Sequence, residues 1–192
     1  MNDDDITKPD HAPLAPADPP PVTDDTPPAV TLLEAAVACA METVGVKEVA
    51  RNSGPEIDLW LAGVGLLPGQ PWCAAWVHAM FLRAARAIGA PSPCPRTGSA
   101  LRLYQLADDN FKLAWSVAVR NDIVRPGQIF VESHGEGKGH CGIVLGVDPK
   151  LGGVCRTVSG NTNEAGSREG NAVVVQWRQT ENWLGILDFG RP

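Results

Sequence analysis

The sequence contains no long apolar run, and its start has no basic segment followed by an apolar one. A helix that crosses a membrane needs about 20 mostly apolar residues, and a secretory signal needs a charged segment ahead of an apolar one. We therefore predict neither membrane insertion nor a signal peptide.

Basic residues are also sparse, and they do not gather into an arm or a patch. Seven of the 22 acidic residues lie in the first 30 positions against a single lysine, so the rest of the chain carries equal numbers of acidic and basic residues. Binding of nucleic acid depends on basic clusters that neutralise phosphates, so we predict no nucleic-acid partner.

Cysteine is too scarce for a disulfide scaffold, since the chain has only five, at positions 39, 73, 94, 141 and 155. An odd count leaves at least one thiol unpaired, which permits a catalytic or metal-binding thiol. Cys141 and Cys155 fall on neighbouring predicted strands. A disulfide between them is one interpretation, and packing in the core is the simpler one.

The first 30 residues hold eight of the 17 prolines and no aromatic residue. Such a segment buries too little apolar surface to offset the entropy that ordering would cost. We predict a disordered, acidic, proline-rich tail over 1–30 and one globular domain over 31–192. The tail is either a solvated extension or a segment that docks on a delivery partner.

The globular part shows helical periodicity first and short strands afterwards. Thr31 and Glu34 have the spacing of a capping box ahead of an apolar helix. The apolar patterns predict helices over 31–44, 55–61, 73–88 and from 97 to 109 or 110. β-Branched and aromatic runs predict strands over 129–131, 141–145, 154–158, 173–177 and 185–189. This order predicts an α+β fold, with the helices packed on an antiparallel sheet of about five strands.

Cys73 follows the turn at Pro71 and Trp72 and begins the third predicted helix. Backbone N–H groups at a helix start carry partial positive charge, which favours a thiolate over a thiol. An ordinary cysteine has a pKa of about 8.5, so a nucleophile at neutral pH needs such a shift. Cys73 is therefore the candidate nucleophile, and the alternative interpretation is a small core residue.

His140 opens an apolar strand within the run Gly139-His-Cys-Gly-Ile-Val144. The flanking glycines allow another backbone to come close, so this histidine could take the Cys73 proton and return it to a leaving amine. His134 is the rival base, although a glycine-rich turn follows it. His78, inside the Cys73 helix, is interpreted as structural or as part of the rim of the site.

Asn161, where a later strand enters a loop, is the candidate third residue that orients the imidazole, although a turn asparagine is the simpler interpretation.

No metal site is predicted. The sequence has no CxxC or HExxH pattern, and His140 and Cys141 on one strand point to opposite faces. The loop before the nucleophile offers only Glu56 and Asp58 to calcium, without a spaced series of carboxylates.

Five short motifs resemble, in order along the chain, the CHAP family of cysteine- and histidine-dependent amidohydrolases and peptidases. They are Asn52-Ser-Gly-Pro-Glu-Ile57, Pro71-Trp-Cys-Ala-Ala-Trp-Val77, Arg125-Pro-Gly-Gln-Ile-Phe130, Gly139-His-Cys-Gly-Ile-Val144 and Ser159-Gly-Asn161. The resemblance covers roughly residues 45–190, and the Trp-Cys-Ala-Ala and Gly-His-x-Gly-Ile-Val blocks are specific as a pair. It implies a papain-like core and cleavage of amide bonds in peptidoglycan.

The resemblance also implies Cys73 as the nucleophile and His140 as the general base. The sequence departs from the family at Ser159, where relatives often have glutamate. We therefore assign the orienting role to Asn161 and keep Ser159 as the second candidate. Gln70, three residues before the nucleophile, is the candidate for an oxyanion hole with the backbone N–H of Cys73.

We therefore predict a monomeric peptidoglycan hydrolase, an N-acetylmuramoyl-L-alanine amidase or an endopeptidase, that works through an acyl-enzyme without a cofactor. Such a protein would be made in the cytoplasm and would reach the periplasm or cell wall through a holin, a virion or a secretion system. A phage lysis or virion-associated enzyme and a secreted bacterial effector both fit. The alternatives are a catalytically decayed cell-wall-binding or virion structural module, and a transferase that passes the acyl group to an amine.

Overall fold

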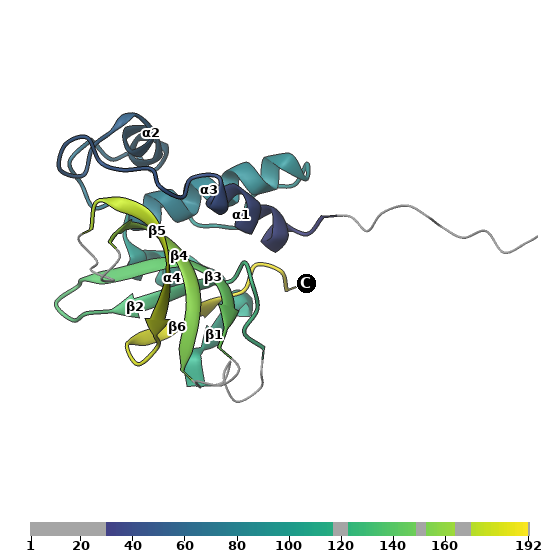
Figure 1. The fold of residues 1–192 in the computed structure, drawn as a ribbon. Helices are drawn as coiled ribbons and strands as arrows, with labels where there is room; N and C mark the ends of the chain where they lie inside the picture. Colours follow the sequence, from purple (N-terminus) through teal and green to yellow (C-terminus); the bar gives the residue numbers. More distant parts are fainter. Residues whose placement is uncertain (1–29, 117–122, 149–152, 164–169, 192) are drawn as a thin grey trace, which may run out of the picture.

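The computed structural model describes residues 30–116, 123–148, 153–163 and 170–191. Within them the chain has the predicted α+β class, with four α-helices ahead of the main strands (Figure 1). The helices are α1 (Leu32–Met41), α2 (Pro55–Gly63), α3 (Cys73–Ala87) and α4 (Ala100–Leu106), followed by one 3₁₀ turn (Asp109–Phe111). Residues 1–29, with the predicted tail and its docking role, lie outside the described residues.

The strands form one antiparallel sheet in the order β1-β6-β2-β3-β4-β5. They are β1 (Lys112–Ala114), β2 (Ile129–Ser133), β3 (Gly139–Val147), β4 (Val154–Thr162), β5 (Ala172–Gln179) and β6 (Trp183–Leu187). The described sheet therefore has six strands where the sequence predicts about five. The additional strand, β1, is an edge strand of three residues that pairs with β6. It was missed because Lys-Leu-Ala has no β-branched or aromatic side chain.

Helix α1 begins with the predicted capping box. The Thr31 hydroxyl accepts from the Glu34 backbone N–H, and the Glu34 carboxylate accepts from the Thr31 backbone N–H. The helix ends at Met41, three residues before the predicted end. The backbone turns away there because the following segment bonds to the edge of the sheet, where the Gly45 N–H donates to the Val173 carbonyl at 3.0 Å.

Figure 1 shows α1, α2 and α3 together on one side of the sheet. The main core lies between these helices and the sheet, and its largest fully buried side chains include Trp72, Trp76, Phe81, Ile57 and Leu61. A second, smaller core contains Phe130, Val144, Cys155 and Trp183. Among the described helices, none combines the length and the apolar character that a membrane span requires.

All five cysteines are free thiols. Cys141 packs in the main core, whereas Cys155 packs in the second core. The disulfide considered for this pair is therefore not formed, and core packing accounts for Cys155. Burial raises the pKa of the Cys155 thiol to about 11, so it stays protonated at neutral pH.

Candidate active site

Cys73 is the first residue of α3, as the sequence predicts. The preceding residue, Trp72, is fully buried, and its indole N–H donates to Glu48 at 2.9 Å. Its ring packs 5.5 Å from that of Trp60. On the other side, a Cβ added at Gly160 of β4 would lie 2.4 Å from the Trp72 ring, so only glycine fits there. The start of α3 is thus anchored to a loop, to α2 and to the sheet.

His140 is the second residue of β3 and is fully buried. The pairing of β2 with β3 sets it opposite Glu132, and its ring centroid lies 6.0 Å from that of Phe130. Neither ring nitrogen makes a hydrogen bond of ordinary geometry within the described part of the chain. Packing therefore contributes to the placement of this imidazole.

The structure brings Cys73, His140 and Cys141 together. The pKa of the Cys73 thiol lies well below its usual value, chiefly because the Cys141 thiol donates a hydrogen bond to its sulfur. Burial opposes this shift. The contact with His140, the positive charge of the His140 imidazolium and the Cys141 backbone N–H lower the pKa of Cys73 further. The His140 contact is a loose one, because neither ring nitrogen reaches hydrogen-bond geometry. These surroundings favour a thiolate at Cys73.

Cys141 is a site residue that the sequence interpretation missed. Burial raises the pKa of its thiol well above the usual value, and the adjacent Cys73 sulfur raises it further. Cys141 therefore stays protonated and serves as a donor to the neighbouring thiolate. The sequence signal for Cys141 was its position directly after His140, which sets its side chain on the opposite face of β3, toward the helices.

We expect Cys141→Ala to slow alkylation of Cys73 by iodoacetamide at neutral pH roughly ten- to a hundred-fold, because a hydrogen bond to a charged group contributes about 1.5–3 kcal/mol. Cys141→Ser keeps a donor at the same place and should retain most of the reactivity. Cys155→Ala, which removes a buried thiol from the second core, is the matched control. Equal alkylation rates for the alanine and serine variants would contradict a donor role.

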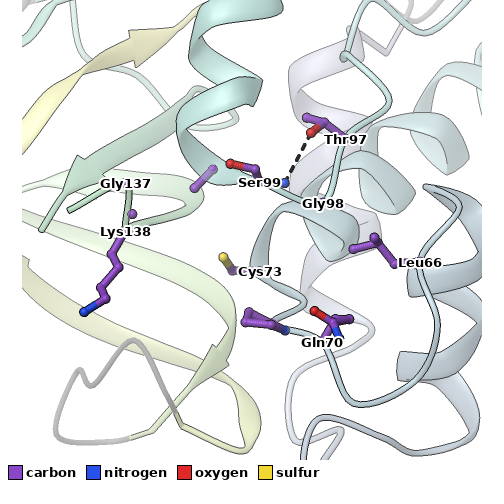
Figure 2. Close-up of a pocket in the computed structure, with 11 residues that line it drawn as sticks. Leu66, Gln70, Cys73, Thr97, Gly98, Ser99, Gly137 and Lys138 are labelled. Carbon is purple, nitrogen blue, oxygen red and sulfur yellow. Dashed lines mark hydrogen bonds between the residues drawn. The ribbon is translucent and has the colours of Figure 1, made fainter. Parts of the chain in front are cut away.

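The Cys73 sulfur faces an open hollow of about 500 Å³ (Figure 2). The hollow is bordered by the α2–α3 loop, the segment before α4 and the β2–β3 turn, and its lining includes Leu66, Gln70, Thr97, Ser99 and Lys138. Cys73 itself is only 5% exposed. A substrate carbonyl could therefore approach the sulfur from this side, while the rest of the residue stays packed.

Gln70 lines the same hollow as Cys73, which is where an oxyanion donor would have to lie. Its role stays a prediction. Gly139 lines this hollow, whereas the next residue, His140, does not. A Cβ on Gly139 would come within 2.9 Å of the Leu101 side chain and the Glu132 carbonyl, so the strand approaches α4 closely at this point.

Both candidates for the third residue are buried in β4. Gly142 has no side chain, and a Cβ there would lie 2.5 Å from that of Ser159 and 2.7 Å from the Phe130 ring. Ser159 therefore shares a face of the sheet with Phe130, and its hydroxyl has no hydrogen-bond partner among the described residues. It could approach the imidazole from that face.

Asn161 has a left-handed backbone conformation, with φ of 56°, at an irregularity in the pairing of β4 with β5. Continuing the β3–β4 register from Ile143 and Val158 would set it opposite His140. Asn161 also lines a second hollow of about 510 Å³, with Glu48, Arg51 and Pro71. Pro71, two residues before Cys73, borders both hollows.

The other two histidines of the domain lie outside this arrangement. His78 is buried in α3, and its Nδ1 contacts the carbonyls of Cys94 and Pro95 at 3.3 and 3.2 Å, which agrees with a structural role. His134 lies just after β2, where its Nε2 is 3.5 Å from the Glu132 carboxylate. His140 is the histidine that influences the Cys73 thiol.

Comparison of the chain with protein-family models, with curated proteins and with solved structures gives no match.

Proposed function

We propose that the chain is a cysteine amidohydrolase or peptidase of the papain-like CHAP type, which cuts amide bonds of peptidoglycan. The observation that carries the proposal is the Cys73 thiol, whose pKa is lowered at the start of α3, where it contacts His140 and faces an open hollow. Perturbed nucleophiles beside a base are typical of catalytic sites. The five motifs that resemble the CHAP family supply the substrate class.

In the proposed reaction, the Cys73 thiolate attacks the carbonyl carbon of an amide and forms a thioester after the C–N bond breaks. The developing oxyanion is stabilised by the backbone N–H of Cys73 and by the Gln70 side chain. His140, as the imidazolium, gives its proton to the departing amine. The neutral imidazole then takes a proton from water, which attacks the thioester and releases the acid. No cofactor takes part in these steps.

Two settings fit this activity: a phage lysis or virion-associated enzyme, and a secreted bacterial effector. In either setting the protein would act as a monomer on the cell wall. Delivery by a holin, a virion or a secretion system would bring it there.

Digestion of purified peptidoglycan, followed by mass spectrometry of the released muropeptides, tests the proposal directly. An amidase releases stem peptides with a free amino-terminal alanine, whereas an endopeptidase shortens stems or opens cross-links. Binding to the polymer without any new fragment would favour the alternative of a decayed binding module. Fragments joined to an added amine would instead indicate a transferase.

We expect Asn161→Ala to lower the turnover rate roughly 100-fold with little change in substrate affinity, because misplacing the base affects the transition state more than ground-state binding. Asn161 has a positive φ, which disfavours alanine, so Asn161→Gly is the matched control. A normal rate for the glycine variant would show that the backbone matters rather than the amide. Kinetics with Ser159→Ala complete the comparison, since a near-normal Asn161→Ala and a crippled Ser159→Ala would transfer the orienting role to Ser159.

A further inference from the structure

A buried carboxylate stands directly beside the candidate base. Glu132 of β2 is opposite His140 of β3, and residues paired in this way share a face of the sheet with Cβ atoms about 4.5–5.5 Å apart. The Glu132 side chain is only 5% exposed. Burying a carboxylate costs several kcal/mol unless charges and hydrogen-bond donors compensate it, so its place next to the imidazole calls for a physical account.

Glu132 has compensating partners. Arg178 donates from Nη1 to both carboxylate oxygens at 3.4 Å, and the indole N–H of Trp183 donates at 3.1 Å. Burial lowers the pKa of Arg178, and the attraction of Glu132 opposes that effect. The Arg178 guanidinium also lies 5.4 Å from the centroid of the Phe130 ring, which in turn lies 6.0 Å from that of His140. The ion pair and the imidazole therefore share one buried compartment.

A structural role alone does not explain an ion pair at this place. Well-packed apolar residues can often replace a buried ion pair without loss of stability. An imidazolium next to a thiolate, by contrast, is stabilised by a nearby negative charge, and the effect is strong where water is excluded. On β4, the other neighbour of β3, Ser159 offers only a hydroxyl and Asn161 only an amide. The neighbouring strand thus has the carboxylate that β4 lacks.

We propose that Glu132 is a positioning residue for the base: its buried carboxylate stabilises the imidazolium that His140 becomes when Cys73 gives up its proton. The inference rests on the proposed function, because it gives Glu132 a task in the Cys73–His140 pair. Within the described part of the chain, the charged and titratable groups around this pair are Cys141 on β3, Glu132 on β2 and Arg178 on β5, with Cys94 near Cys141 and His134 3.5 Å from the Glu132 carboxylate. Arg178 opposes Glu132 in its effect on the imidazolium, and its positive charge also attracts the Cys73 and Cys141 sulfurs.

The opposite charges of Glu132 and Arg178 allow a test that separates charge from structure. The rate of Cys73 alkylation by iodoacetamide is measured from pH 5 to 9 in the full chain, with circular dichroism to confirm folding. Glu132→Gln should slow alkylation near pH 6 on the order of ten-fold, with its half-maximal rate moved to higher pH. Arg178 repels the imidazolium but attracts the Cys73 sulfur, so Arg178→Gln serves as the background in which the ion pair is already broken. Adding Glu132→Gln to that background should again move the half-maximal rate to higher pH, because the carboxylate acts on the imidazolium directly.

If Glu132 served only to hold Arg178, the double variant would react at the same rate as Arg178→Gln alone. That pattern, or pH profiles that coincide with the wild type, would overturn the inference. If Glu132→Gln does not fold, the comparison of the double variant with Arg178→Gln decides alone. Alkylation also separates this inference from the proposed function. A wild-type Cys73 no more reactive than the other cysteines refutes the thiolate site itself, whereas a reactive Cys73 with unshifted variants refutes only the role of Glu132.

Discussion

Replacement of Cys73 by alanine is expected to reduce the release of peptidoglycan fragments to background. The alanine has no nucleophile, so the acyl-enzyme cannot form, and neither His140 nor the oxyanion donors can act on an intermediate that does not exist. The midpoint of thermal unfolding should stay close to that of the wild type. The substitution removes one sulfur atom at the edge of an open hollow, and it removes a group whose ionised form is costly to bury. Turbidity clearing and muropeptide analysis measure the first effect, and calorimetry measures the second.

Two further variants sharpen this test. Cys73→Ser keeps nearly the same shape but has a far less acidic nucleophile, and it should be almost as inactive as the alanine variant. Cys155→Ala removes a thiol from the second core and should retain activity. Activity of Cys73→Ala above about a tenth of the wild type would remove Cys73 from the role of nucleophile.

The fold class and the position of Cys73 at the start of a helix could be predicted because both follow from local signals. The capping box at Thr31 fixes the start of α1, and the Pro-Trp turn ahead of an apolar period of 3.6 residues fixes that of α3. His140 at the start of β3 follows from the glycine-flanked apolar run. Each of these features needs only a few neighbouring residues, and tertiary packing does not override them.

The features that could not be predicted depend on which strands are neighbours. Cys141 acts on Cys73 only because α3 begins next to the start of β3, and Glu132 faces His140 only through the β2–β3 register. The sequence showed that His140 and Cys141 point to opposite faces, but not that one sulfur could contact both. The positive φ of Asn161 also depends on the local pairing of β4, since asparagine adopts that conformation only where its surroundings favour it.

Replacement of His140 by alanine is expected to lower hydrolysis by about 10²–10⁴-fold, the usual contribution of a general acid–base group. The same variant should alkylate more slowly at Cys73, because the imidazolium no longer stabilises the thiolate. The loss in alkylation should be the smaller of the two. The Cys141 thiol and backbone N–H still lower the pKa of Cys73 in the variant, whereas hydrolysis also needs a proton for the leaving amine and a base for water.

The matched variant is His134→Ala, which removes the rival base six residues earlier. His134 contacts the carboxylate of Glu132 at 3.5 Å and is not among the groups that shift the pKa of Cys73, so hydrolysis should stay within a few-fold of the wild type. Initial rates on purified peptidoglycan and the alkylation rate of Cys73, measured on the same preparations, rank the two histidines independently. A larger loss for His134→Ala in both measurements would make His134 the base. A loss of hydrolysis in His140→Ala with unchanged alkylation would instead leave His140 as a proton donor that does not activate the thiol.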